Sequence, residues 1–136
     1  MRIAITGGSC GIGRAVIALV LTQGYSVVSI DRALPASESI QPDVTFVEAD
    51  FTQYAVLEHA LRGCDGVVHL AAITSPGCHP DHVVHNNVVS SYNALRAAAQ
   101  LGIRRVCQAS SVNATGLAYS RWPLRLFSAR RSTSDV

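Results

Sequence analysis

The chain has 136 residues, of which 49% are hydrophobic and 15% charged, and a formal net charge of +2. That length fits one domain, and the composition excludes disordered and fibrous proteins. The longest apolar run, residues 15–21, is too short to cross a bilayer, and we see no secretory signal, so a cytoplasmic protein is expected. Four widely spaced cysteines without a C-x-x-C pair favour buried, reduced thiols.

Short apolar runs alternate with longer helical stretches, which is typical of βαβ units around a parallel sheet. Strands are predicted at residues 2–6, 26–31, 44–48, 66–70 and 104–109. Helices are predicted between them, at about residues 11–23, 53–62 and 80–101. Apolar residues at helical spacing indicate the faces that these helices bury. They are Ala15, Val16, Leu19, Val20, Val56, Leu57, His59, Ala60, Leu61, Val84, Val88, Leu95, Ala98 and Ala99.

The stretch "TGGSCGIG", residues 6–13, lies directly between the first strand and the first helix, and Asp31 ends the second strand. This combination is the context of a dinucleotide-binding fingerprint, although an ordinary strand-to-helix turn is the alternative. Gly7 would allow the sharp turn, Gly11 would leave room for the pyrophosphate, and Gly13 would let the helix approach the sheet closely. The free amides at the helix start would bind the phosphates.

The acidic residue indicates which dinucleotide is preferred. Asp31 can accept hydrogen bonds from both hydroxyls of the adenosine ribose, and its charge would repel a 2'-phosphate. NAD is therefore favoured over NADP. The adjacent Arg32 could instead pair with such a phosphate, but we interpret it as a solvated loop residue.

The spacing T-G-x-x-x-G-x-G resembles that of the short-chain dehydrogenase/reductases. Three later segments are similar to the extended branch, the NAD-dependent epimerase/dehydratase family: "EADFTQ" (48–53), "VVHLAAITSP" (67–76) and the stretch 86–116. The resemblance covers about residues 1–120, which would form the NAD(P)-binding domain. Residues 121–136 would be an irregular basic tail.

The resemblance implies a Rossmann-like, doubly wound parallel α/β sheet of five strands, incomplete, in the order 3-2-1-4-5. It also implies a set of residues that contact the dinucleotide. They are Thr6, Gly7, Gly8, Ser9, Cys10, Gly11, Ile12, Gly13, Asp31, Arg32, Asp50, Phe51, Leu70, Ala71, Ala72, Asn87 and Ala109.

The implied activity is hydride transfer at a carbon that bears a hydroxyl, often on a sugar nucleotide in relatives. Ser111 matches the catalytic serine, which would hydrogen-bond the substrate oxygen, and Ser110 is the second choice. Both hydroxyls could also simply cap a strand end.

The family moves its proton with a tyrosine in Tyr-x-x-x-Lys, and this chain contains no lysine. Tyr119 is followed four residues later by Pro123, so we assign it no catalytic role. We expect dinucleotide binding without turnover. A truncated or frame-shifted copy of a longer enzyme would explain both the missing pair and the tail.

Other interpretations carry less weight. A metal site at Cys78, His79, His82 and His85, and contact of the basic tail with nucleic acid or membrane, are not favoured. A homodimer through helix 80–101 is expected by resemblance. The alternative function is a non-catalytic dinucleotide sensor, and a nonfunctional remnant with an exposed fifth strand is a third.

Overall fold

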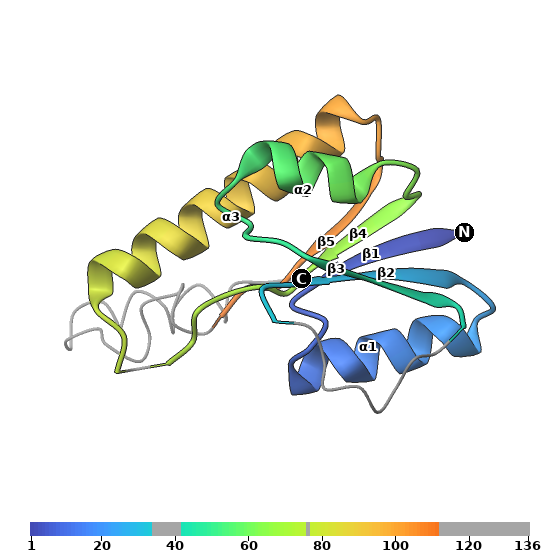
Figure 1. Ribbon diagram of the computed structural model, residues 1–136, viewed down its shortest axis with the longest axis horizontal. Coiled ribbons are helices and arrows are strands. Elements are labelled where there is room, and N and C mark those ends of the chain that lie inside the picture. Colours follow the sequence, from blue (N-terminus) through green and yellow to red (C-terminus); the bar gives the residue numbers. More distant parts are fainter. Residues whose placement is uncertain (34–41, 76, 112–136) are drawn as a thin grey trace, which may run out of the picture.

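The computed structural model describes residues 1–33, 42–75 and 77–111. In this part of the chain five parallel strands form one sheet in the order β3-β2-β1-β4-β5 (Figure 1). The strands are β1 (Arg2–Thr6), β2 (Ser26–Asp31), β3 (Val44–Glu48), β4 (Gly66–His69) and β5 (Arg105–Gln108). The predicted strand order is confirmed, and each strand end lies within about a residue of its predicted position.

Helices cover both faces of the sheet. Helix α1 (Gly11–Thr22) lies on one face, and α2 (Tyr54–Leu61) and α3 (Pro80–Gln100) lie on the other (Figure 1). Successive strand residues point to opposite faces, so Val27 packs in the cluster beside α1 while Val28 packs in the cluster beside α2 and α3. Covering both faces explains why the inner strands are almost continuously apolar.

All three predicted helix faces need correction. Helix α1 buries Gly13 and Ile17, and the predicted Val16 and Val20 pack partly buried beside them, whereas Ala15 is exposed and Leu19 is 63% exposed. In α2 the buried residues are Leu57, Ala60 and Leu61, as predicted, but Val56 and His59 are exposed.

Helix α3 differs most from its prediction. Of the predicted inward residues only Ala98 is buried, while Val84, Val88 and Leu95 are 61%, 62% and 47% exposed, and Ala99 is exposed. The buried residues are small or polar: Asn86, Ser90, Asn93, Ala94, Ala97 and Ala98. Asn86 and Asn93 on this face bind Arg32 and the carbonyls of Phe51 and Thr52, while Ala94, Ala97 and Ala98 pack in the core, so polar contacts and small apolar residues together orient the helix.

The cysteine prediction is partly wrong. All four thiols are free, but only Cys64 is buried, and Cys10 and Cys107 are exposed. Burial raises the pKa of the Cys64 thiol. Tyr119 and the tail 121–136 lie outside the described residues.

Candidate functional site

The predicted site residues follow the carboxyl ends of the five strands. Thr6 and Asp31 end β1 and β2, Asp50 follows β3, and segments 70–72 and 109–111 follow β4 and β5. Because all the strands are parallel, these positions share one edge of the sheet. Asn87 reaches the same edge from the N-terminal half of α3.

The glycine loop after β1 is too tight for side chains. Gly7 has φ +73°, and a Cβ there would lie 3.0 Å from the amide nitrogen of Ala71. A Cβ on Gly13 would lie 2.2 Å from the Gly7 carbonyl oxygen, and one on Gly8 would lie 2.1 Å from the Ser29 Oγ. Gly13 therefore permits the close approach that its spacing predicts, but its nearest neighbours are the loop backbone.

The first turn of α1 presents amides to an open space. Cys10 caps the helix, its Sγ accepting a hydrogen bond from the Gly13 amide at 3.3 Å. The amides of Gly11 and Ile12 have no acceptor among the described residues. A Cβ on Gly11 would meet nothing within 4 Å. Open space in front of unpaired helical amides is what an anionic group requires.

Asp31 is oriented by the backbone around it. Its Oδ2 accepts a hydrogen bond from the Ser9 amide at 3.0 Å, and its Oδ1 accepts one from the Arg32 amide at 2.7 Å. The Ser9 hydroxyl donates to the Ala33 carbonyl oxygen at 2.8 Å. The carboxylate is thus fixed beside the glycine loop, and each oxygen keeps a further lone pair for a ligand.

The side chain of Arg32 binds an amide on α3. Its Nη2 donates to the Oδ1 of Asn86 on α3 at 2.7 Å. Asn86 is only 5% exposed, and its own Nδ2 donates to the Oδ1 of Asn87 at 3.2 Å. Arg32 is exposed, as its interpretation as a solvated loop residue expects, and the buried amide of Asn86 gives it a specific partner in addition.

Asp50 closes a short turn after β3. Its Oδ1 accepts hydrogen bonds from the Thr52 amide at 2.9 Å and from the Thr52 hydroxyl at 2.8 Å. These bonds hold the pKa of Asp50 below its usual value, and the positive charges of Arg32 and His85 add to the effect. Next to it, Phe51 is 3% exposed and belongs to the core under α2 and α3, so its backbone rather than its ring faces the site edge.

The loop after β4 is held from two sides. The Oγ1 of Thr6 accepts hydrogen bonds from the amides of Leu70 and Ala71, each at 3.2 Å. Asn87 binds both polar groups of Ile73: its Oδ1 accepts from the amide at 2.8 Å, and its Nδ2 donates to the carbonyl at 3.0 Å. Asn87 therefore positions this loop, and Ala72 is exposed within it.

A residue that sequence reasoning missed lies under this loop. The His69 ring is 2% exposed, with its Nδ1 2.7 Å from the Thr6 Oγ1 and its Nε2 3.4 Å from the Ser91 Oγ. The Thr6 oxygen already accepts two amides, so its own hydrogen is left for Nδ1, and Nε2 carries the ring proton. Burial lowers the pKa of His69 and keeps the ring neutral.

Sequence reasoning had only a weak signal for this histidine. It ends a strand in which Val67 is buried, and alternate residues of a strand share a face, so an inward direction for position 69 was readable. Its partners come from β1 and α3, however, and no local spacing relates them.

The serines follow β5. The Ala109 amide donates to the His69 carbonyl oxygen at 3.0 Å, which ties this segment to β4. Ser110 and Ser111 come directly after it and are exposed. The structure thus brings both serines to the carboxyl edge beside the β4 loop, and it does not choose between them.

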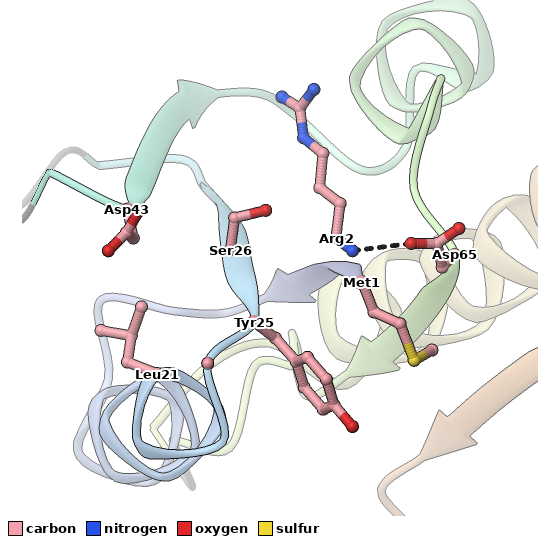
Figure 2. A pocket seen from close by; sticks show the side chains of 8 residues that line it. Met1, Arg2, Leu21, Tyr25, Ser26, Asp43 and Asp65 are labelled. Carbon is pink, nitrogen blue, oxygen red and sulfur yellow. Dashed lines mark hydrogen bonds between the residues drawn. The ribbon is translucent and has the colours of Figure 1, made fainter.

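A hollow of about 430 Å³ lies at the opposite edge of the sheet. Figure 2 shows Asp43 and Asp65 around it, with the Arg2 amide donating to the Asp65 Oδ2 at 2.7 Å. None of its lining residues belongs to the glycine loop. We therefore separate this hollow from the candidate site, which is an open edge rather than an enclosed cavity.

Two further observations concern only the described residues. No group of three or more His, Cys, Asp or Glu side chains there could hold a metal ion. No helix in the same ranges has the length and apolar character to cross a membrane.

The sequence model of the NAD-dependent epimerase/dehydratase family matches residues 3–125. The chain belongs to this family. A UDP-glucose 4-epimerase of Corynebacterium glutamicum is 30% identical over 122 residues. An uncharacterised protein of Mycobacterium tuberculosis is 37% identical over 111 residues. A uronate dehydrogenase of Agrobacterium tumefaciens, solved in complex with NAD, is 27% identical with a TM-score of 0.69.

These family members are much longer than the matched region. The matches cover 85%, 82% and 81% of this chain, but only 36%, 12% and 40% of the epimerase, the mycobacterial protein and the dehydrogenase, respectively. The chain therefore corresponds to less than half of each of them. The matched region contains the five-stranded sheet, and the activities of the longer proteins do not transfer directly.

Proposed function

We propose that this chain binds NAD as the dinucleotide-binding part of an epimerase/dehydratase-type oxidoreductase. The observation that carries the proposal is the open first turn of α1, with the Gly11 and Ile12 amides unpaired among the described residues, in the same glycine loop whose Ser9 amide fixes the carboxylate of Asp31. Unpaired amides suit a diphosphate, and a carboxylate suits ribose hydroxyls. The NAD complex of a structurally similar uronate dehydrogenase supports the choice of ligand.

Each candidate residue has a place in this proposal. The loop from Thr6 to Gly13 would surround the diphosphate, and Asp50 and the Phe51 backbone would flank the adenine. The segment from Leu70 to Ala72 would line the cofactor together with Ala109, while Asn87 holds that segment in place. Bound NAD would supply a hydride acceptor for a substrate carbon that carries a hydroxyl.

The expected partner on the substrate side is Ser111, whose hydroxyl would donate a hydrogen bond to the reacting oxygen. A sugar nucleotide is the proposed substrate class, since one relative is a UDP-glucose 4-epimerase. No lysine occurs in the 136 residues, so the Tyr-x-x-x-Lys pair is missing from this chain. We therefore propose that the chain alone binds without turnover.

The missing lysine also favours a second candidate function, a non-catalytic protein in which NAD occupancy alters contacts with a partner. Both candidates predict no NADH formation with UDP-sugars and uronates, and only the second predicts that NAD changes the binding of a partner. The proposal predicts no turnover by the chain alone while NAD raises its melting temperature. Turnover that is lost in Ser111→Ala would contradict the no-turnover statement and make the chain an enzyme in itself.

A further inference from the structure

The Arg32–Asn86 contact joins two elements at the edge where the adenosine would lie. Arg32 follows β2 and Asn86 lies on α3, 54 positions later in the chain, yet Nη2 and Oδ1 are 2.7 Å apart. Neither Asp31 nor Asp50 forms an ion pair with Arg32 in the described ranges. A guanidinium with two carboxylates in its vicinity is thus bound by a neutral amide.

Asn86 is well suited to hold this arginine in one orientation. The asparagine is 5% exposed, and its Nδ2 is bound to Asn87, which is itself fixed by two hydrogen bonds to Ile73. This chain of amides sets the direction of the Asn86 oxygen. The oxygen is therefore a fixed acceptor that draws an exposed cation toward α3.

The direction matters because Arg32 is the cation next to the residue that would bind the ribose. A guanidinium beside Asp31 could pair with a 2'-phosphate and so accept NADP. We propose that Asn86 is a specificity-determining residue: by holding the Arg32 guanidinium against α3, it withholds that cation from a 2'-phosphate and lowers the affinity for NADP. This inference rests on the proposed binding of NAD at the same edge.

The test compares dissociation constants for NAD and NADP in four proteins: wild type, Asn86→Leu, Arg32→Leu and the double variant. Leucine is close in size to asparagine, and the bonds between Asn87 and Ile73 remain. We expect Asn86→Leu to raise the affinity for NADP by at least about threefold and to change the affinity for NAD by less than about twofold. The double variant should lose that gain.

Arg32 is exposed to solvent, so Arg32→Leu is the variant with the lowest risk of misfolding. With Asn86 present, it should change NADP affinity by less than about threefold. A loss of about tenfold or more would show that Arg32 already reaches the phosphate, and it would overturn the inference. An equal gain for NAD and NADP in Asn86→Leu would overturn it too, because the arginine would then be a general obstruction.

Failure of the role of Asn86 and failure of the proposed binding of NAD give different results. If wild type binds NAD and the Asn86→Leu ratio of affinities is unchanged, only the role of Asn86 is wrong. If wild type binds neither dinucleotide, the proposed function is wrong and this inference falls with it.

Discussion

Gly11 and Gly13 stand two residues apart at the start of α1, yet their surroundings differ completely. A side chain at Gly11 would enter open space, whereas one at Gly13 would collide with the backbone of Gly7 and Gly8. The fold requires a glycine at position 13 and not at position 11, in agreement with the proposed role of Gly11 toward a ligand.

This difference gives a testable separation of stability from binding. Gly13→Ala should lower the free energy of unfolding by at least about 2 kcal/mol, because backbone atoms cannot move aside cheaply. Gly11→Ala should leave it within about 0.5 kcal/mol of wild type and weaken NAD instead. Denaturant unfolding and NAD titration of both variants check this. Equal losses of stability would contradict the assignment.

His69 gives a prediction about how the stability of the fold depends on pH. Burial lowers its pKa below the usual 6.5, so the unfolded chain binds the proton more readily than the folded one. The contribution of neutral His69 to the free energy of unfolding is fully present above the usual pKa and is lost as the pH falls below it. His69→Asn should therefore lose less free energy of unfolding than wild type between about pH 7 and about pH 5.

A matched control for this variant is His59→Gln, since His59 is exposed on α2. It should keep the wild-type dependence on pH. If His69→Asn is destabilised by acid as steeply as wild type, His69 is not the group responsible.

At the scale of elements, α3 exposes an apolar stripe. Val84, Val88, Tyr92 and Leu95 are spaced by four, four and three residues and share one side of the helix. Such an exposed stripe can mark a contact with another protein, and the homodimer through helix 80–101 stays a prediction.

The predicted homodimer can be tested by introducing a negative charge into the apolar stripe of α3. Val88→Glu should shift sedimentation toward the monomer without loss of stability, because Val88 is 62% exposed. Leu19→Glu is the matched control, since Leu19 is 63% exposed on the opposite face of the sheet. An unchanged sedimentation profile for Val88→Glu, or an equal effect of Leu19→Glu, would rule out this surface.

Elements were easier to predict than their orientations. Strands and helices follow local signals: β-branched runs, the glycine loop, and stops at Gly24 and Gly102, both of which have positive φ. The buried face of α3 followed no such signal. Asn93 turns inward to donate to the carbonyls of Phe51 and Thr52, at 3.0 Å each, and that contact exists only once α3 packs beside the turn between β3 and α2.

The same limit applies to the site. The glycine loop and Asp31, each readable in one short stretch of sequence, do meet at the carboxyl edge of the sheet, where the binding of a dinucleotide stays a prediction. The role of Cys10 as the cap of α1 and the role of Asn86 as the partner of Arg32 could not be predicted. Nothing in the sequence distinguishes Cys10 from other thiols or Asn86 from other polar helix residues. Their roles depend on Gly13 and Arg32, which only the folded chain brings to them.

For the whole molecule, binding at this edge should couple to folding. The proposed ligand would bridge the loops after β1, β2 and β4, which are joined by hydrogen bonds such as those to Thr6 and Asp31. NAD at about 100 times its dissociation constant should raise the free energy of unfolding by about 2.7 kcal/mol. Thermal unfolding with and without NAD measures this, and adenine alone should give a smaller shift.

The central claim is that unpaired amides at the start of α1 bind the diphosphate of NAD, and calorimetric titration tests it most directly. Wild type should bind NAD, and Gly11→Asp should weaken binding by at least about tenfold, because it sets a carboxylate in front of those amides. Ala18→Asp, which adds the same charge on the exposed side of α1 two turns later, should change the affinity by less than about twofold. Undetectable binding of NAD by wild type, or full affinity in Gly11→Asp, would contradict the account.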